Sequence, residues 1–163
     1  MYNLQMDTLK LVELTKKDYP DLYDFMHDVW VDTYSHIIPL SHIELLLHKY
    51  FDADNIPGFL SKGYKYYYIF DKENAGLLVY ADKIDEIYLD KLYVLPEHRG
   101  KGYAAFALTE LKKLGKDITL NVNRNNERAV TVYKRLGFEI EKVVDIIVSD
   151  ENINEDYVMR LKV

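Results

Sequence analysis

The feature that most constrains the fold is a strand–turn–helix–strand unit in the second half of the chain. Ile84–Val94 is rich in aromatic and branched residues and predicts a strand. After an Arg-Gly-Lys-Gly turn, an alanine-rich run predicts a helix from about Gly100 to Leu114, and Gly115 is its stop signal. Ile118–Asn123 predicts the next strand. Strands joined through a helix pair in parallel, so this unit requires one parallel contact in the sheet.

The rest of the chain predicts antiparallel strands and further helices. Alternating or aromatic-rich segments predict strands at Thr8–Leu14, Tyr64–Phe70, Ala75–Ala81, Phe138–Val148 and Asp156–Lys162. Helical spacing predicts a helix from Asp18 to about His36, a second helix capped by Ser41, and another from about Asn126 to Gly137. Residues 52–63 are predicted to form a loop that contains one helical turn. The order indicates an α+β fold with a mixed sheet, in a single domain spanning residues 1–163.

Composition narrows the possible functions. The 163 residues include no cysteine, which excludes disulfides, thiolate metal sites and a thiol nucleophile. The net charge of −6 argues against nucleic-acid binding and suits a cationic substrate, and the tyrosine-rich strands indicate sheet packing. No run approaches the roughly 20 apolar residues of a membrane span. The first residues resemble neither a signal nor a transit peptide, so we expect a cytoplasmic protein with no membrane partner. The histidines lack ligand spacing, and we expect no metal site.

The glycine turn has the chemistry of an anion site. The first turn of a helix carries unpaired N–H groups and partial positive charge, which suit a phosphate. Gly100 and Gly102 leave room for close approach, and Arg99 and Lys101 add positive charge. The turn lacks the third glycine of a dinucleotide fingerprint and the Gly-Lys-Ser/Thr of a triphosphate loop. Taken alone, the turn is better explained as a plain glycine-containing connection with charged surface residues.

A second motif changes that balance. In "LNVNRNNERAVTVYKRLGFE", the spacing of Leu120, Val122, Asn126, Ala129, Tyr133, Gly137 and Phe138 matches a signature at every position. Together with "LYVLPEHRGKGYA", it resembles the GNAT superfamily of acyl-CoA N-acyltransferases over nearly the whole chain. The resemblance implies a mixed, mainly antiparallel sheet of about seven strands with about four flanking helices, splayed at the acetyl-CoA site. One position departs from the pattern, because Glu97 stands where the family has Gln or Arg.

The resemblance also implies the residues that bind acetyl-CoA. The pyrophosphate would lie on the turn at residues 99–104, and the pantetheine arm would run between the strands ending at Val94 and containing Leu120–Val122. Backbone groups of Leu92 and Val94 would bind the arm, although ordinary sheet pairing is the alternative. The full implied set is Leu92, Tyr93, Val94, His98, Arg99, Gly100, Lys101, Gly102, Tyr103, Ala104, Asn126, Ala129 and Tyr133.

Catalytic residues follow from the same resemblance. Tyr133 matches the family's general acid, which protonates the departing thiolate; its alternative is a core tyrosine. Asn126 matches a pantetheine contact, and a helix N-cap is the alternative or an additional role. Glu86 or Asp90 would take the proton of the amine, with a water chain or a plain polar strand face as alternatives.

The acceptor side is the least determined part. Trp30, Tyr34 and His36 lie in a run similar to the acceptor-lining first helix of many GNAT enzymes, with core packing as the alternative. The sequence therefore predicts an acetyl-CoA-dependent N-acetyltransferase that works by direct attack in a ternary complex. Its acceptor would be a primary amine: a polyamine, another small amine or a protein N-terminus. We expect a monomer or homodimer. A non-catalytic acyl-CoA-binding regulator on the same fold is the alternative, and a nucleotide module unrelated to CoA is disfavoured by the second motif.

Overall fold

The computed structural model describes residues 8–150 and 152–163, which form one seven-stranded sheet in the order β1-β2-β3-β4-β5-β7-β6. The strands are β1 Lys10–Glu13, β2 Tyr64–Asp71, β3 Glu73–Asp82, β4 Glu86–Val94, β5 Asp117–Asn123, β6 Glu139–Ser149 and β7 Asn152–Leu161. The helices are α1 Tyr19–Tyr34, α2 Leu40–Phe51, α3 Ile56–Ser61, α4 Tyr103–Lys112 and α5 Glu127–Arg135. The pair β4–β5 is parallel, as predicted, and the other pairs are antiparallel.

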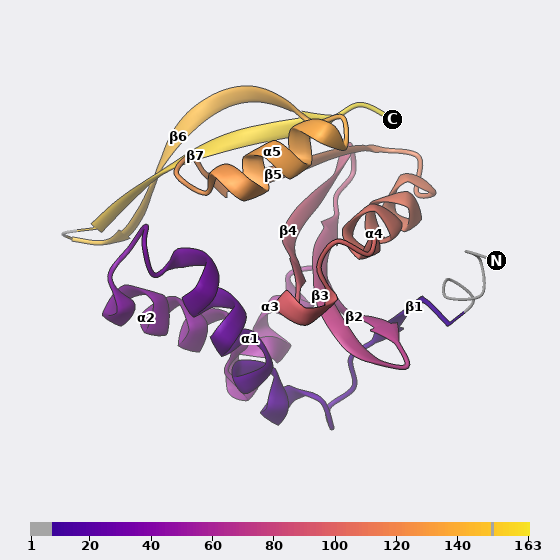
Figure 1. Cartoon of the computed structure of the whole chain (residues 1–163), viewed down its shortest axis with the longest axis horizontal. Helices are drawn as coiled ribbons and strands as arrows, with labels where there is room; N and C mark the ends of the chain where they lie inside the picture. Colours follow the sequence, from indigo (N-terminus) through magenta and orange to yellow (C-terminus); the bar gives the residue numbers. More distant parts are fainter. Residues whose placement is uncertain (1–7, 151) are drawn as a thin grey trace.

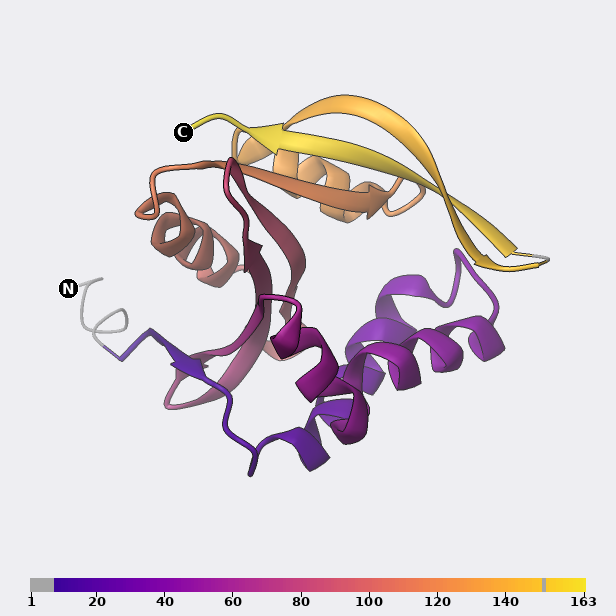
Figure 2. The ribbon, with the colours of Figure 1, turned by 180° about the vertical axis from the view of Figure 1, so that it is seen from behind.

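Helices cover both faces of the sheet. Strand residues alternate between faces, so Leu78 belongs to the core under α4 and α5, whereas its neighbours Leu77 and Val79 belong to the core under α1, α2 and α3. Figure 1 shows α4 on one side of β2–β4 and α1 and α2 on the other. Figure 2 shows the long β6–β7 hairpin extending past the sheet toward the connection between α1 and α2.

Three helix details differ from the sequence prediction. The segment 52–63, read as a loop, contains a 3₁₀ turn at Ala53–Asn55 and the helix α3, which makes five α-helices in the described residues where about four were predicted. Buried Ile56 anchors α3 to the core, a contact that local sequence does not reveal. The helix α2 begins at Leu40 after Pro39, so the prediction that Ser41 is its cap is wrong.

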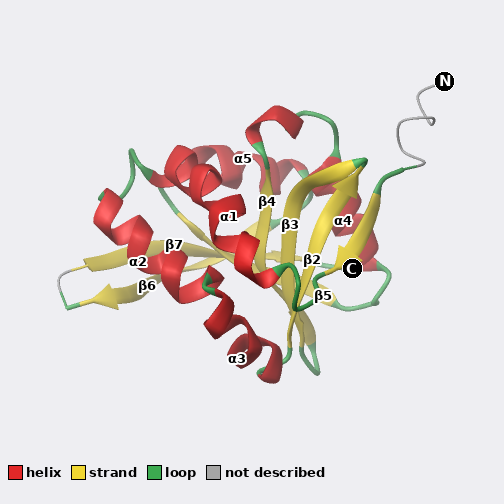
Figure 3. Cartoon of the chain, turned by 90° about the horizontal axis from the view of Figure 1, so that it is seen from below, coloured by secondary structure: helices red, strands yellow, loops and turns green. Residues whose placement is uncertain are grey.

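Several strand boundaries also differ, and β1 and β3 begin at Lys10 and Glu73 where Thr8 and Ala75 were predicted. The strand β4 begins at Glu86 and not at Ile84, and β7 begins at Asn152, ahead of the predicted Asp156. The polar residues that precede Asp156 pair with β6 across the hairpin, and this pairing extends the strand beyond its apolar part. Figure 3 shows this hairpin beside α2, away from the centre of the sheet.

The parallel pair separates half-way along its length. Pairing of β4 with β5 runs from Glu86↔Asp117 to Leu89↔Leu120 and stops there, although β4 continues to Val94 and β5 to Asn123. The separation coincides with a bulge: Tyr80 pairs with Leu89, Val79 pairs with Lys91, and Asp90 is the additional residue on β4. A bulge bends its strand. The sheet is therefore splayed between β4 and β5, as predicted.

Candidate functional site

The glycine turn lies between the open end of β4 and the start of α4. Gly100 and Gly102 have φ angles of 78° and 82°, in the left-handed region that favours glycine. A Cβ on either residue would meet nothing within 4 Å, so the space above the turn is open. The first helical hydrogen bond runs from the Phe106 N–H to the Gly102 carbonyl at 3.0 Å, which leaves the N–H groups of Tyr103 and Ala104 to face outward. This arrangement fits a phosphate group.

The charged residues of the turn have separate positions. The Arg99 guanidinium donates to the Val94 carbonyl (3.2 Å) and pairs with Asp32 of α1 (3.0 Å), so it braces the turn against α1. Lys101 is exposed and leaves its positive charge at the turn. Glu97 is also exposed, and a solvated carboxylate there does not obstruct the backbone groups.

Side chains beneath the turn hold it in place. The Tyr103 hydroxyl donates to the carboxylate of Asp71, which also accepts from Thr8. The bonds from Thr8 and Tyr103 lower the pKa of Asp71, and the bond to Asp71 raises the pKa of Tyr103 to about 12. His98 is buried, and its Nε2 lies 2.7 Å from a carboxylate oxygen of Glu73. The side chains of Tyr103 and His98 are therefore supports, and Tyr103 offers a ligand its backbone N–H.

Backbone groups of β4 line one side of the splay. The Leu95 N–H donates to Ala75 on β3 at 2.8 Å. Successive backbone groups of a strand point to opposite edges, so those of Val94 and Leu92 point away from β3, toward β5. Beyond Leu89 no strand residue of β5 pairs with them. An extended arm could therefore add to this edge like a strand.

Three tyrosines and one asparagine meet at the mouth of the splay. The Tyr34 hydroxyl of α1 lies 2.7 Å from the Tyr93 hydroxyl of β4. Burial raises the pKa of Tyr34, while hydrogen bonds to Tyr93 and Asn126 oppose the shift. Burial, followed by the charge of Tyr34, raises the pKa of Tyr133 on α5 above the usual value for a phenol, which is protonated at neutral pH in either case. The Asn126 side chain also accepts from the Ala129 N–H (3.3 Å) and is the N-cap of α5.

The other residues predicted on the acceptor side are less accessible or more remote. Trp30 is 4% exposed and packs against Tyr34, Phe51 and Tyr93, with ring centroids 5.2, 5.3 and 5.8 Å away. It is a core residue that supports the tyrosine cluster. His36 is exposed in the turn after α1.

Comparisons with known proteins agree with this geometry. A family model described as the acetyltransferase (GNAT) family matches residues 17–138. The chain belongs to this family. Acetyl-CoA is the co-substrate of GNAT acetyltransferases, and the open turn and unpaired strand edge fit its pyrophosphate and pantetheine arm.

The similar solved structures share the fold of this GNAT chain at low identity. PaiA N-acetyltransferase from Thermoplasma acidophilum, in complex with coenzyme A, has a TM-score of 0.79 at 20% identity, covering 95% of this chain and 99% of that chain. Spermidine N-acetyltransferase from Vibrio cholerae, in complex with CoA and spermine, has a TM-score of 0.68 at 19% identity, covering 96% of both chains. Naa50 from Arabidopsis thaliana, in complex with a bisubstrate analogue, has a TM-score of 0.61 at 19% identity, covering 96% and 99%.

The curated relatives match only part of their length. The human cysteine-rich protein 2-binding protein is 38% identical over 71 residues, which is 42% of this chain and 9% of that protein. The peptidyl-lysine N-acetyltransferase YjaB from Escherichia coli (strain K12) is 34% identical over 53 residues, which is 32% of this chain and 36% of that protein.

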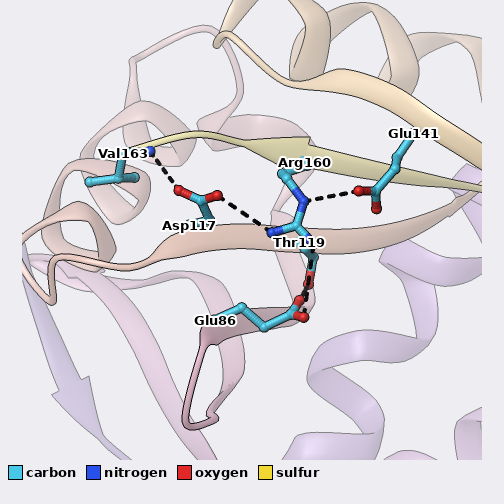
Figure 4. A network of polar contacts seen from close by, with 6 residues as sticks. All are labelled: Glu86, Asp117, Thr119, Glu141, Arg160 and Val163. Carbon is cyan, nitrogen blue, oxygen red and sulfur yellow. Dashed lines mark hydrogen bonds and ion pairs between the residues drawn. The ribbon is translucent and has the colours of Figure 1, made fainter.

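Of the two predicted bases, Glu86 lies at the closed end of the splay. It is the first residue of β4, where β4 still pairs with β5, and its carboxylate accepts from the Thr119 hydroxyl. Arg160 of β7 lies 3.9 Å away and also pairs with Asp117 (3.5 Å) and Glu141 (3.1 Å). Figure 4 shows this network, which joins β4, β5, β7 and β6. Glu86 therefore has a place in cross-strand contacts, in the half of β4 that is still paired with β5.

Asp90, the other predicted base, lies at the bulge where the strands separate. Its carboxylate pairs with the ammonium of Lys91 at 2.8 Å, and that ammonium stands 4.1 Å from the centre of the Tyr50 ring. Asp90 is thus at the open part of the sheet but already has a cationic partner.

Sequence reasoning missed a groove and a carboxylate. The groove has a volume of about 540 Å³ and lies between the α1–α2 connection, the end of β5 and the β6–β7 hairpin. Its lining residues are Ile37, Ile38, His42, Asn123, Arg124, Asn125, Ile153, Asn154 and Glu155. Asp156 follows in β7, and burial raises its pKa to about 6. No local signal marks these residues, because the tertiary fold alone brings the hairpin beside α2.

Within residues 8–150 and 152–163, no three His, Asp or Glu side chains gather closely enough to hold a metal ion. None of the helices in the same part of the chain combines the length and the apolar character needed to cross a membrane.

Proposed function

We propose that this GNAT protein transfers the acetyl group of acetyl-CoA to a primary amine by direct attack in a ternary complex. The observation that carries the proposal is the opening between β4 and β5 beside a turn of two left-handed glycines. Acetyl-CoA supplies an activated thioester. The rest of the chemistry falls to residues of this chain, which has no cysteine to carry the acetyl group.

Each part of the site has a distinct task in the proposal. The N–H groups of the turn at residues 99–104 bind the pyrophosphate. The outward backbone groups of Leu92 and Val94 bind the pantetheine arm and polarise the acetyl carbonyl, which stabilises the oxyanion as the amine attacks. Asn126 keeps α5 capped and offers its amide to the arm. The Tyr133 hydroxyl, which is protonated at neutral pH, gives its proton to the departing sulfur.

The proposed acceptor is a small cationic amine. The protein carries a net charge of −6, and the acceptor face of the sheet holds Asp90 and Asp156 among tyrosines. The similar structures include one enzyme in complex with spermine and one with a peptide analogue, and YjaB is named for peptidyl-lysine. All three acceptors are primary amines. The type of reaction and the identity of the amine can therefore be tested separately.

Two measurements test the chemistry. Acetyl-CoA at millimolar concentration should raise the melting temperature, because a ligand that binds the folded state stabilises it by mass action. A panel of spermidine, a lysine-containing peptide and the pentapeptide Met-Val-Asn-Ala-Leu should then release free thiol from acetyl-CoA with at least one amine. Absence of any thermal shift from well-folded protein refutes acetyl-CoA binding.

A thermal shift without turnover of any amine would instead favour the acyl-CoA-binding regulator. Protonated Tyr133 at the mouth of the splay argues for catalysis, because binding alone does not need an acid there. The proposal also keeps a cytoplasmic location and a monomer or homodimer as predictions from the sequence. One similar structure, the spermidine N-acetyltransferase from Vibrio cholerae, is described as dodecameric, so the assembly should be measured directly by light scattering.

A further inference from the structure

One half-buried carboxylate faces the acceptor side of the sheet. In β7, Met159 and Leu161 point into the core under α4 and α5, so Asp156 and Arg160 point to the opposite face. That face is the one covered by α1 and α2. The register places Asn123 of β5 directly beside Asp156, at the end of β5 that has separated from β4.

Tyrosines from three other elements lie within range of the charge of this carboxylate. Tyr34 of α1, Tyr50 of α2 and Tyr88 of β4 each have a pKa raised first by burial and also by the negative charge of Asp156. Asp90 adds to the same effect at Tyr50 and Tyr88, so it faces the same space. Tyr34 in turn bonds to Tyr93 at the mouth of the splay. Asp156 is therefore linked through one tyrosine to the place where Tyr133 stands.

Three cations of this region already have acidic partners, whereas Lys49 and Lys83 lie over the rings of Tyr50 and Tyr88. Arg124 pairs with Glu155, Lys91 with Asp90, and Arg160 with Asp117 and Glu141. In the described part of the chain, no ion pair or hydrogen bond reaches the Asp156 side chain. A half-buried charge without a partner is unfavourable. The described residues supply no partner for this charge, and an ammonium group from a ligand has the required positive charge.

We propose that Asp156 binds the ammonium group of the acceptor and takes its proton before the amine attacks. This inference rests on the proposed acetyl transfer. The N–H bond of the ammonium breaks and the proton moves to the carboxylate. The freed nitrogen lone pair then forms the N–C bond with the acetyl carbon. The C–S bond breaks, the sulfur takes the proton of Tyr133, and the second proton lost by nitrogen restores that phenol.

The acidity of Asp156 suits this role. Burial raises its pKa from the usual 3.8 to about 6, so the carboxylate is ionised at neutral pH but is a better base than an exposed aspartate. Two pKa units shift the proton-transfer equilibrium about 100-fold toward the free amine. Asp90 already has a cationic partner in Lys91, so an incoming ammonium group would have to compete with that pair.

The first test is the pH dependence of kcat/KM for spermidine and for the pentapeptide Met-Val-Asn-Ala-Leu. If an ionised Asp156 meets a protonated amine, kcat/KM should rise tenfold per pH unit below about 6. For spermidine, kcat/KM should then stay level up to about pH 10, where the amine loses its own proton. For the pentapeptide the level part should end near pH 8, because an α-amino group has a pKa of about 7.7–8.0. If the enzyme instead takes up only the free amine, kcat/KM should rise through pH 6 without a break.

The second test compares three variants. Asp156→Asn should lower kcat/KM about 100-fold or more at pH 7.5 and remove the break near pH 6, while the Kd for acetyl-CoA stays within threefold. Asp145→Asn, an exposed carboxylate on β6, is the matched control and should change neither quantity. An unaltered break in Asp156→Asn, or its loss in Asp90→Asn alone, would overturn the inference.

A direct titration separates this inference from the proposed function. The ¹³C carboxyl resonance of Asp156, assigned by its absence in Asp156→Asn, should titrate near pH 6 in the wild-type protein. Adding CoA and spermidine should lower that midpoint, because a bound ammonium favours the charged carboxylate. If the amine leaves the midpoint unchanged, Asp156 does not bind the amine, even in an active enzyme. If no amine is acetylated yet the midpoint falls, only the proposed catalysis fails.

Discussion

The glycine turn can be tested by separating its backbone strain from its ligand contacts. Gly102→Ala puts a methyl group on a residue with φ of 82°, in open space above the turn. An L-residue in the left-handed region costs about 1–2 kcal/mol. For a chain of this size, the melting temperature should fall by about 2–8 °C.

Gly115→Ala supplies the matched control at the other end of α4. Its φ is 74°, and a Cβ there also meets nothing within 4 Å, so the strain is the same but no phosphate contact is involved. Both variants should therefore lose similar stability. Only the Gly102 methyl stands where the pyrophosphate approaches. Loss of one hydrogen bond to a charged group costs about 1.5–3 kcal/mol, which is about 10- to 100-fold in affinity.

Isothermal titration with acetyl-CoA and thermal melts of both variants give the two quantities. We expect equal melting temperatures within about 2 °C, and a Kd for acetyl-CoA at least tenfold weaker in Gly102→Ala than in Gly115→Ala. Equal affinities with equal losses of stability would show that the Gly102 conformation serves the fold alone and that the phosphate lies elsewhere.

Three further outcomes follow from the site. Tyr133→Phe should lower kcat at least tenfold with an unchanged Kd for acetyl-CoA. Because burial raises the pKa of the Tyr133 phenol, neither the wild type nor the variant should lose activity at high pH through ionisation of this group. An unchanged kcat would leave Tyr133 with a packing role alone. Glu86→Gln should leave the pH–rate profile within twofold of wild type, since the amide oxygen still accepts from Thr119; loss of the acid limb would identify Glu86 as the base. As pH rises from 4 to 7, the wild-type protein should lose stability relative to Asp156→Asn, because the buried carboxyl of the wild type must ionise in that range. A difference in melting temperature that stays constant with pH would contradict the burial of this charge.

Local patterns determined most of the architecture. The strand–glycine–helix–strand unit required the parallel β4–β5 pair, and the spacing from Leu120 to Phe138 carried the family, because both depend on residues near one another in the chain. The N-cap role, weighed for Asn126 beside a pantetheine contact, is present in the structure, because its side chain accepts from Ala129. The sequence singled out Gly100 and Gly102 for the room they leave above the turn, and the structure adds that both have positive φ angles.

Only the tertiary structure decided which polar side chains meet at the splay. In sequence, Glu86 and Asp90 are equivalent polar positions on one strand, but the bulge at Asp90 opens the sheet there and leaves Glu86 in the closed half. Asp156 is remote in sequence from Tyr34, and its neighbours are set by strand register and by the packing of α1 and α2. Register and packing are long-range properties. Chain order therefore determined the fold and the acetyl-CoA side of this protein, while three-dimensional packing decided its acceptor side.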